Sequence, residues 1–195
     1  MASDFLFNVQ YGIDHVLDIN GYDHVLFLIL LTVAYSFESW KQLFMLVTAF
    51  TLGHTVALLL AAYGVLNIDD ALVEFLIPVT IALAAIYNII DGGKSIKSKG
   101  ASWLFLITLC FGVVHGLGFG REFKLFIGKS DDKLLPLLEF ALGIEIAQLI
   151  IVFLMLLLGL VAQVIFKRNR RDWILVVSAA VLGLVIPILK ANIFW

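Results

Sequence analysis

The sequence predicts an all-α polytopic membrane protein, with six transmembrane helices preceded by a short amphipathic helix at the membrane interface. Hydrophobic residues make up 62% of the 195 residues and charged residues only 14%, whereas a soluble domain is about a quarter charged. The net charge of −2 indicates no nucleic-acid partner, and the single cysteine, Cys110, excludes a disulfide framework. We therefore expect one integral membrane domain over residues 1–195, with the lipid bilayer as its surroundings.

The first 21 residues are of mixed polarity and too few to span a bilayer, so they are expected to form the interfacial helix. Six apolar segments follow, and each is predicted to be one transmembrane helix. They occupy about 23–37, 41–66, 71–90, 102–120, 134–166 and 173–194. The first is short for a span, and the fifth is long enough to tilt or to extend beyond the membrane.

Lysine and arginine in the short loops predict the orientation of the chain. With the N-terminus outside, eight of these residues are cytoplasmic: Lys41, Lys94, Lys97, Lys99, Lys167, Arg168, Arg170 and Arg171. Five are then external: Arg121, Lys124, Lys129, Lys133 and Lys190. This bias places both termini outside and makes 91–100 and 167–172 cytoplasmic loops.

A short repeat opens the chain, because Gly-x-Asp-His-Val-Leu occurs at Gly12–Leu17 and again, nine residues on, at Gly21–Leu26. Each copy sets an aspartate beside a histidine, as Asp14 and His15 and then as Asp23 and His24. A carboxylate next to an imidazole fits the arrangement in which an acid orients a histidine ligand of a metal. The plain alternative is that the first pair is solvated on a surface helix.

Further polar side chains fall in the outer half of the predicted bundle or near its midplane. A charged group at the centre of a bilayer costs at least ~2.5 kcal/mol, so such groups indicate function unless they lie at the interface or bond to a neighbouring helix. The additional candidate metal ligands are His54, Glu74, His115, Glu139 and Glu145. Helical spacing adds the supporting polar candidates Thr51, Thr55, Asn88 and Gln148.

Small residues recur in the fourth predicted span, where Gly112, Gly116 and Gly120 are spaced four apart and allow close helix packing. His115 lies beside this face, so close packing is expected to bring its imidazole near other helices. Imidazole combined with carboxylate suits nickel, cobalt, copper, iron or zinc, whereas calcium and magnesium prefer oxygen ligands alone. The pattern therefore predicts a transition-metal site.

Five ordered blocks of the chain resemble the HupE/UreJ family of bacterial membrane proteins. They read GYDHVLFLILL, VTAFTLGHTVAL, LVEFLIPVTIALAAIYN, FGVVHGLGFG and ALGIEIAQLIIV, between Gly21 and about Val152. The resemblance implies a location in the bacterial inner membrane and a role in nickel or cobalt uptake. Carried over by motif, it implies site residues at Asp23, His24, His54, Glu74, Asn88, His115, Glu145 and Gln148.

The chain departs from the family pattern in two of these blocks. Gly53-His54-Thr55 stands where the family usually has Ala-His-Ser, which preserves the hydroxyl. The better-known hydrogenase-linked members carry His-Pro before the Gly-x-Asp-His block, whereas here His15 occupies the repeated motif and no proline precedes it. The second departure weakens the specific assignment to nickel more than it weakens metal binding.

The leading functional hypothesis is a secondary importer that accepts a divalent transition metal, nickel or cobalt favoured, from outside. On this hypothesis His24 at the mouth and His54 near the midplane act at successive depths. Binding should weaken as the pH falls through the histidine range near ~6.5, because protons compete for imidazole nitrogen. Two alternatives stay open: an intramembrane zinc-dependent hydrolase acting on a lipid, and an accessory protein that binds metal without transporting it. The sequence gives no indication of the oligomeric state.

Overall fold

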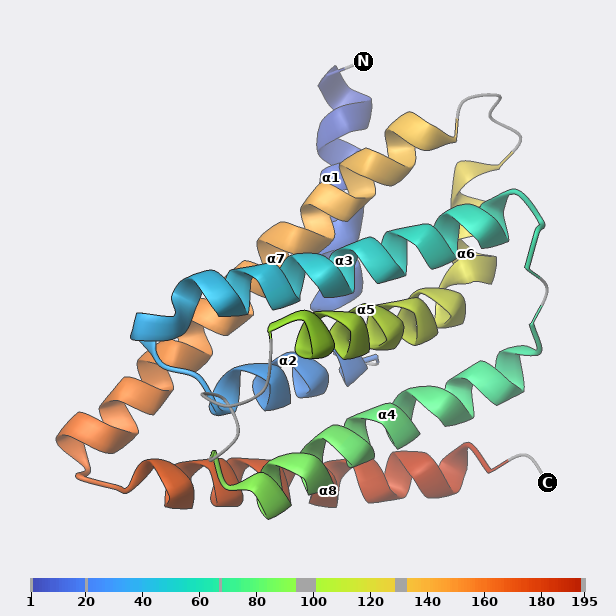
Figure 1. Ribbon diagram of the computed structural model, residues 1–195. Coiled ribbons are helices and arrows are strands. Elements are labelled where there is room, and N and C mark those ends of the chain that lie inside the picture. Colours follow the sequence, from blue (N-terminus) through green and yellow to red (C-terminus); the bar gives the residue numbers. More distant parts are fainter. Residues whose placement is uncertain (1, 20, 67, 94–100, 129–132, 194–195) are drawn as a thin grey trace.

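The computed structural model describes residues 2–19, 21–66, 68–93, 101–128 and 133–193, and their regular secondary structure is entirely helical (Figure 1). The all-α prediction is therefore confirmed. The elements are α1 (Ala2–Val16), α2 (Asp23–Val33), η1 (Phe37–Ser39), α3 (Trp40–Ala62), α4 (Asp70–Asp91), α5 (Ala101–Gly118), α6 (Gly120–Ile127), α7 (Leu134–Leu160), η3 (Val161–Ile165) and α8 (Arg170–Ala191).

Among the described residues, four helical stretches are long and apolar enough to cross a membrane: Phe37–Ala62, Asp70–Asp91, Leu134–Ile165 and Arg170–Ala191. A fifth exists if Trp103–Gly118 and Gly120–Ile127, which meet at a bend of 59°, are taken as one broken span. The prediction of six spans is thus not confirmed. The segment expected at 23–37 forms only the 11 residues of α2, which reach roughly 17 Å and fall short of the ~30 Å hydrocarbon core.

The short α2 ends where a cation meets its C-terminus. Arg170 at the start of α8 donates a hydrogen bond from Nη2 to the carbonyl oxygen of Ala34, the residue that follows α2. A cation at this end of a helix is favourable because the last carbonyls lack intrahelical partners and carry partial negative charge. The side chain of Asn88 on α4 also donates to the carbonyl of Leu30 in α2, at 2.8 Å.

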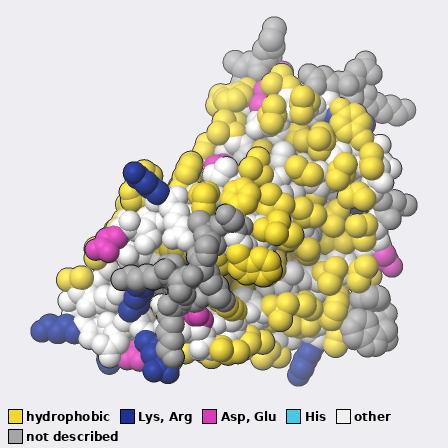
Figure 2. Space-filling view, viewed as in Figure 1, with side chains coloured by type: hydrophobic (Ala, Val, Ile, Leu, Met, Phe, Trp, Pro, Cys, Tyr) yellow, Lys and Arg dark blue, Asp and Glu magenta, His cyan; other side chains and the backbone are white. Residues whose placement is uncertain are grey.

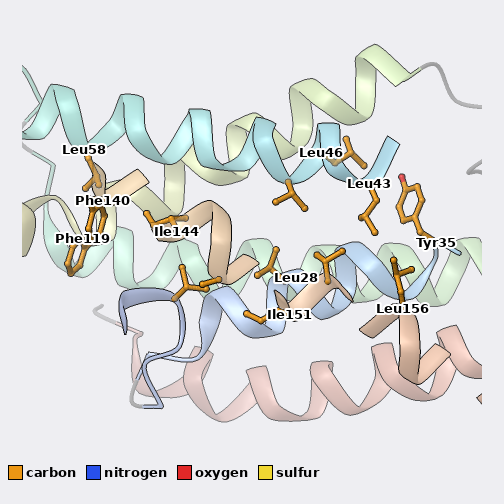
Figure 3. Packing of buried hydrophobic residues seen from close by; sticks show 14 of the residues in the cluster. Leu28, Tyr35, Leu43, Leu46, Leu58, Phe119, Phe140, Ile144, Ile151 and Leu156 are labelled. Atoms are coloured by element: carbon orange, nitrogen blue, oxygen red, sulfur yellow. The ribbon is translucent and has the colours of Figure 1, made fainter. Parts of the chain in front are cut away.

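The N-terminal segment forms α1, which packs against α7 and α6. Asn8 of α1 donates to a carboxylate oxygen of Glu139 in α7 at 2.6 Å, and Tyr11 stacks on Phe126 of α6 with ring centroids 4.2 Å apart. Leu28 of α2 and Ile151 of α7 belong to the same buried cluster (Figure 3). The two short helices α1 and α2 therefore both pack on α7, and the placement of α1 at the membrane interface stays a prediction.

Helices α3 and α5 pack closely together, and glycines make this close approach possible. A Cβ on Gly112 would overlap the carbonyl oxygen of Phe50, and one on Gly116 would overlap the carbonyl oxygen of His54. Gly53 faces the carbonyl of Leu109 from the other helix in the same way. The close approach that the spacing of small residues predicts is confirmed, and it brings the backbones of α3, which carries His54, and α5, which carries His115, into contact.

The outer surface agrees with a bilayer environment. Figure 2 shows apolar side chains over most of the visible face, with the lysines and arginines toward its edges. Large apolar residues such as Leu83, Phe153 and Val176 are more than half exposed on helices that could span the membrane. In water such exposure is costly, whereas hydrocarbon tails solvate it.

Candidate metal centre

Three histidines from three helices meet inside the bundle. His15 lies in the last turn of α1, His24 in the first turn of α2, and His54 in the second half of α3. Each offers one ring nitrogen, and these three atoms lie within 4.8 Å of one another. One ion with metal–nitrogen bonds of ~2.0–2.1 Å holds its tetrahedral ligands about 3.4 Å apart, so small side-chain rotations bring the three nitrogens to bonding distance.

His115 of α5 lies beside this group, with its ring centroid 5.3 Å from that of His24. Its Nδ1 is 2.9 Å from the carbonyl oxygen of Phe111. A carbonyl only accepts hydrogen bonds, so Nδ1 carries the proton and Nε2 keeps a free lone pair. This is the tautomer that a histidine presents when it binds a metal through Nε2.

The ring nitrogens of all four histidines include buried atoms with no hydrogen-bond partner among the described residues. These atoms are Nε2 of His15, Nε2 of His24, both nitrogens of His54 and Nε2 of His115. Buried polar atoms are nearly always paired, and an unpaired one costs ~1–3 kcal/mol. His15, His24 and His54 each bring one such nitrogen to within 4.8 Å of the others, and a metal ion that accepts their lone pairs would provide the missing partner.

The protonation state of His15 also suits a metal ligand. Loss of solvation around its ring holds the pKa of the His15 imidazole well below its ordinary value of 6.5, and the neighbouring ring of His24 lowers it further. The imidazole is therefore neutral at neutral pH, which is the form that binds a metal ion.

A family model described as HupE / UreJ protein matches residues 1–191. The chain belongs to the HupE/UreJ family. No curated protein and no solved structure matches it. The family match and the apolar helices identify it as an integral membrane protein, and the match includes α1, so His15 lies within the family region together with His24, His54 and His115.

In this HupE/UreJ protein the two copies of the repeated motif have different surroundings. The rings of His15 and His24 lie together, with centroids 4.7 Å apart. Asp23 is 3.3 Å from Nδ1 of His24 and can orient that ring. Asp14, by contrast, is exposed and accepts a hydrogen bond from Gln10 at 2.7 Å, so its carboxylate is not part of the histidine group.

Aromatic rings surround the histidines, and the sequence analysis did not single them out. The ring centroid of Phe119 is 3.9 Å from that of His15, and Phe50 is 5.1 Å from His115. Phe140 and Phe27 contact the same group at centroid distances of 5.6 Å from His15 and 5.5 Å from His115. Of these rings, Phe50 could have been identified from the sequence, because it lies one turn before His54 on the same face of the helix. Such rings exclude water and strengthen electrostatic interactions inside the site.

A polar network joins α3 to α7 one turn from His54. Glu145 accepts hydrogen bonds from Thr48 at 2.7 Å and from Thr51, and Oε1 of Gln148 lies 3.0 Å from the Thr51 hydroxyl. Thr48 is a member that the sequence analysis missed, although it is one turn before Thr51 on the same face. Thr55, a predicted member, donates to the Thr51 carbonyl at 2.7 Å. Glu145 is thus held near the site by threonines and is not among the grouped ligand atoms.

Three other predicted site residues occupy different places. Glu139 accepts the hydrogen bond from Asn8 of α1, Asn88 bonds to the backbone of α2, and Glu74 is exposed on α4. None of these belongs to the described group of ligand atoms. Their side chains bond to other helices or to the surface, so they lie apart from the histidine group.

Proposed function

We propose that this protein is a secondary importer of a divalent transition metal, with nickel or cobalt favoured, and that the histidine group binds the ion during passage. The observation that carries the proposal is the meeting of three imidazoles, within 4.8 Å, at the junction of α1, α2 and α3. The HupE/UreJ membership supports nickel and cobalt as the metals. Imidazole also binds copper, zinc and iron, which are the other metals to be tested.

The ligand set is compatible with passage as well as with binding. An ion that crosses must be bound well enough to lose water and weakly enough to leave. Neutral imidazoles meet both conditions, since they replace water molecules without neutralising the ion, and Asp23 is the carboxylate beside them. A divalent ion moving into a cell gains roughly 4.6 kcal/mol per 100 mV of membrane potential, which supplies a driving force without nucleotide hydrolysis.

The rings of His24 and His54 lie 5.4 Å apart, which changes one expectation. Residues at successive depths would be separated by several helical turns, whereas these two rings share one site. We therefore propose a single main binding site to which α1, α2 and α3 each contribute a ligand, and the separate capture stage expected at His24 is not retained.

The deciding experiment combines elemental analysis of the purified protein with metal flux in proteoliposomes. We expect saturable uptake of Ni²⁺ or Co²⁺ under an inward-negative potential, and its loss in His54→Ala. Binding without flux under any gradient would instead assign the protein as an accessory metal-binding protein.

One observation favours a second candidate, an intramembrane zinc-dependent hydrolase acting on a lipid. A cavity of about 260 Å³ is lined mainly by apolar residues that include Phe27, Leu30, Leu83 and Phe111. Phe27 also contacts the ring of His115, so this one side chain separates an acyl chain in the cavity from the histidine group. One stoichiometric zinc that resists dialysis, with no flux of any transition metal, would favour this candidate over the importer.

A further inference from the structure

α1 differs from the other helices of the site in how it is attached. His24 belongs to a helix that is bonded to α4 and α8 through the carbonyls of Leu30 and Ala34, and His54 belongs to a membrane-spanning helix. His15 belongs to α1, whose 15 residues are not among the described helices long and apolar enough to span. Its position therefore depends on side-by-side contacts with α6 and α7.

The closest of these contacts is between two glycines. A Cβ on Gly12 would overlap the carbonyl oxygen of Phe140, and one on Gly143 would overlap the carbonyl oxygen of Val9. The Cβ position of each glycine is also 3.1 Å from the Cα of the other. Gly12 is three residues before His15, so this contact lies within one turn of the ligand.

A polar contact holds the next turn of α1. Asn8 is buried, and its amide donates to Glu139 of α7 at 2.6 Å. Glu139 is one turn before Gly143, as Asn8 is one turn before Gly12, so the two contacts form adjacent steps along one interface. A hydrogen bond from a buried amide to a carboxylate is one of the stronger kinds.

We propose that Gly12 with Gly143, and Asn8 with Glu139, are positioning residues that dock α1 on α7 and thereby deliver His15 as the third imidazole of the metal site. This inference rests on the proposed metal site. It also gives Glu139, which sequence depth alone suggested as a ligand, a different role as the anchor of α1.

The geometry predicts how strongly an alanine at Gly12 or Gly143 weakens metal binding. An alanine at either glycine requires the helices to separate by about 1 Å to restore an ordinary carbon–oxygen contact of ~3.3 Å. The three ring nitrogens lie within 4.8 Å and must still approach one another to bind one ion, so we expect a further shift of about 1 Å to remove His15 from the coordination sphere while α1 stays on α7. The affinity should fall about 10- to 100-fold, the range seen when residues that orient metal ligands are changed.

The repeated motif supplies a matched control. Gly21 stands where Gly12 stands in the first copy, and a Cβ there would meet nothing closer than 3.9 Å. Gly12→Ala and Gly143→Ala should each weaken Co²⁺ binding, while Gly21→Ala should leave it unchanged.

Two substitutions at Glu139 test the polar contact: glutamine keeps an oxygen acceptor for Asn8, and leucine removes it. We expect E139Q to bind Co²⁺ as the wild type does and E139L to bind it more weakly.

The readout that separates positioning from general damage is the ligand count. X-ray absorption at the cobalt edge should show one imidazole fewer in Gly12→Ala than in the wild type, as in His15→Ala. The double variant Gly12→Ala with His15→Ala should lose no further affinity beyond His15→Ala, because both changes remove the same ligand.

A second readout needs no metal and reports contact between α1 and α6. It is cross-linking of Phe7→Cys with Phe126→Cys on a Cys110→Ser background, since the ring centroids of Phe7 and Phe126 are 6.0 Å apart. Cross-linking of this pair should fall in Gly12→Ala.

Three outcomes would contradict these expectations, and each contradicts a different part of them. An unchanged imidazole count and affinity in Gly12→Ala would overturn the positioning role while leaving the proposed importer intact. Equal weakening by E139Q and E139L would show that the charge of Glu139 is required, and would overturn its role as a simple acceptor for Asn8. Wild-type protein that binds no Co²⁺, Ni²⁺ or Zn²⁺ would overturn the proposed function itself, together with the inference that depends on it.

Discussion

At the scale of single residues, the repeated Gly-x-Asp-His motif has two different surroundings. Gly-x-Asp-His occurs twice, yet Asp23 lies against His24 whereas Asp14 is exposed and bonded to Gln10. The chemistry of the residues is identical in both copies. What differs is which side of each helix the neighbouring helices cover, so the carboxylate contributes to the site in one copy only.

The two aspartates therefore provide a direct comparison. Asp23→Asn should lower metal affinity about 10- to 100-fold, because the carboxylate that orients His24 becomes a neutral amide. Asp14→Asn should leave the affinity within experimental error of the wild type. Equilibrium dialysis of Ni²⁺ or Co²⁺ against the purified variants measures both, and equal effects of the two substitutions would contradict the asymmetry.

The pH dependence of binding follows from the environment of His15. Its imidazole has a pKa well below 6.5, so in the folded protein it stays neutral through the range in which an ordinary histidine gains a proton. Protonation of His15 should thus not contribute to loss of metal at pH 6 and should do so only at lower pH, as isothermal calorimetry of the wild type beside His15→Gln can show. Half-loss of affinity at pH 6.5 in the wild type but not in His15→Gln would contradict a desolvated ring.

The lowered pKa of His15 also predicts how the stability of the metal-free protein changes with pH. The unfolded chain takes up a proton at His15 near pH 6.5 and the folded chain does not, so stability is present above this pH and declines as the pH falls below it. Thermal unfolding of the metal-free protein between pH 7.5 and 5 should show this decline. His15→Gln should reduce it, since that side chain does not titrate.

At the scale of elements, the close packing of α3 on α5 positions the backbone of His54. The Cβ position of Gly116 overlaps the carbonyl of His54, and that of Gly112 overlaps the carbonyl of Phe50. This contact is also the clearest case in which spacing in the sequence predicted packing. The length of α2 was not predictable in that way, because its apolar residues continue past Val33 and the helix ends where Arg170 meets the carbonyl of Ala34.

Gly116→Ala should therefore destabilise the protein by about 1–3 kcal/mol, the usual cost of overpacking a tight interface, and should weaken metal binding as α5 shifts away from His54. Gly183 on α8 is the control, since a Cβ there meets nothing within 4 Å. Gly183→Ala should be neutral or stabilising by about 0.5–1 kcal/mol, because alanine is the better helix former. Thermal unfolding in detergent distinguishes the two, and equal destabilisation would refute the packing argument.

At the scale of the whole molecule, the orientation proposed from lysine and arginine counts can be tested at the two ends of the bundle. Asn169 precedes α8 in the loop expected to be cytoplasmic, and Val65 follows the end of α3 at Ala62, at the end of the second predicted span that is expected to face outside; both are exposed. On a Cys110→Ser background, an impermeant thiol reagent added to intact cells should label Val65→Cys and leave Asn169→Cys unlabelled. The reverse pattern would invert the proposed topology.

The sequence alone determined the class of the protein, its family and the residue types of its site. Long apolar runs force helices because a bilayer offers no partner for backbone hydrogen bonds, and this holds whatever the tertiary arrangement. Costly polar residues in such runs likewise identify His24, His54 and His115 without any coordinates. Depth along a helix was predictable because it follows from counting residues at 1.5 Å each.

Only the tertiary structure decided which of these residues meet. His15, which only the repeated motif suggested, joined the histidine group, whereas Glu74, which satisfied the depth argument, did not. Glu139 is bonded to Asn8 of a helix that lies 131 residues away in the chain. The reason is physical: the face that a helix turns toward the site depends on how it packs against helices far away in the sequence, and a glycine contact such as that of Gly12 with Gly143 sets that packing to within an ångström.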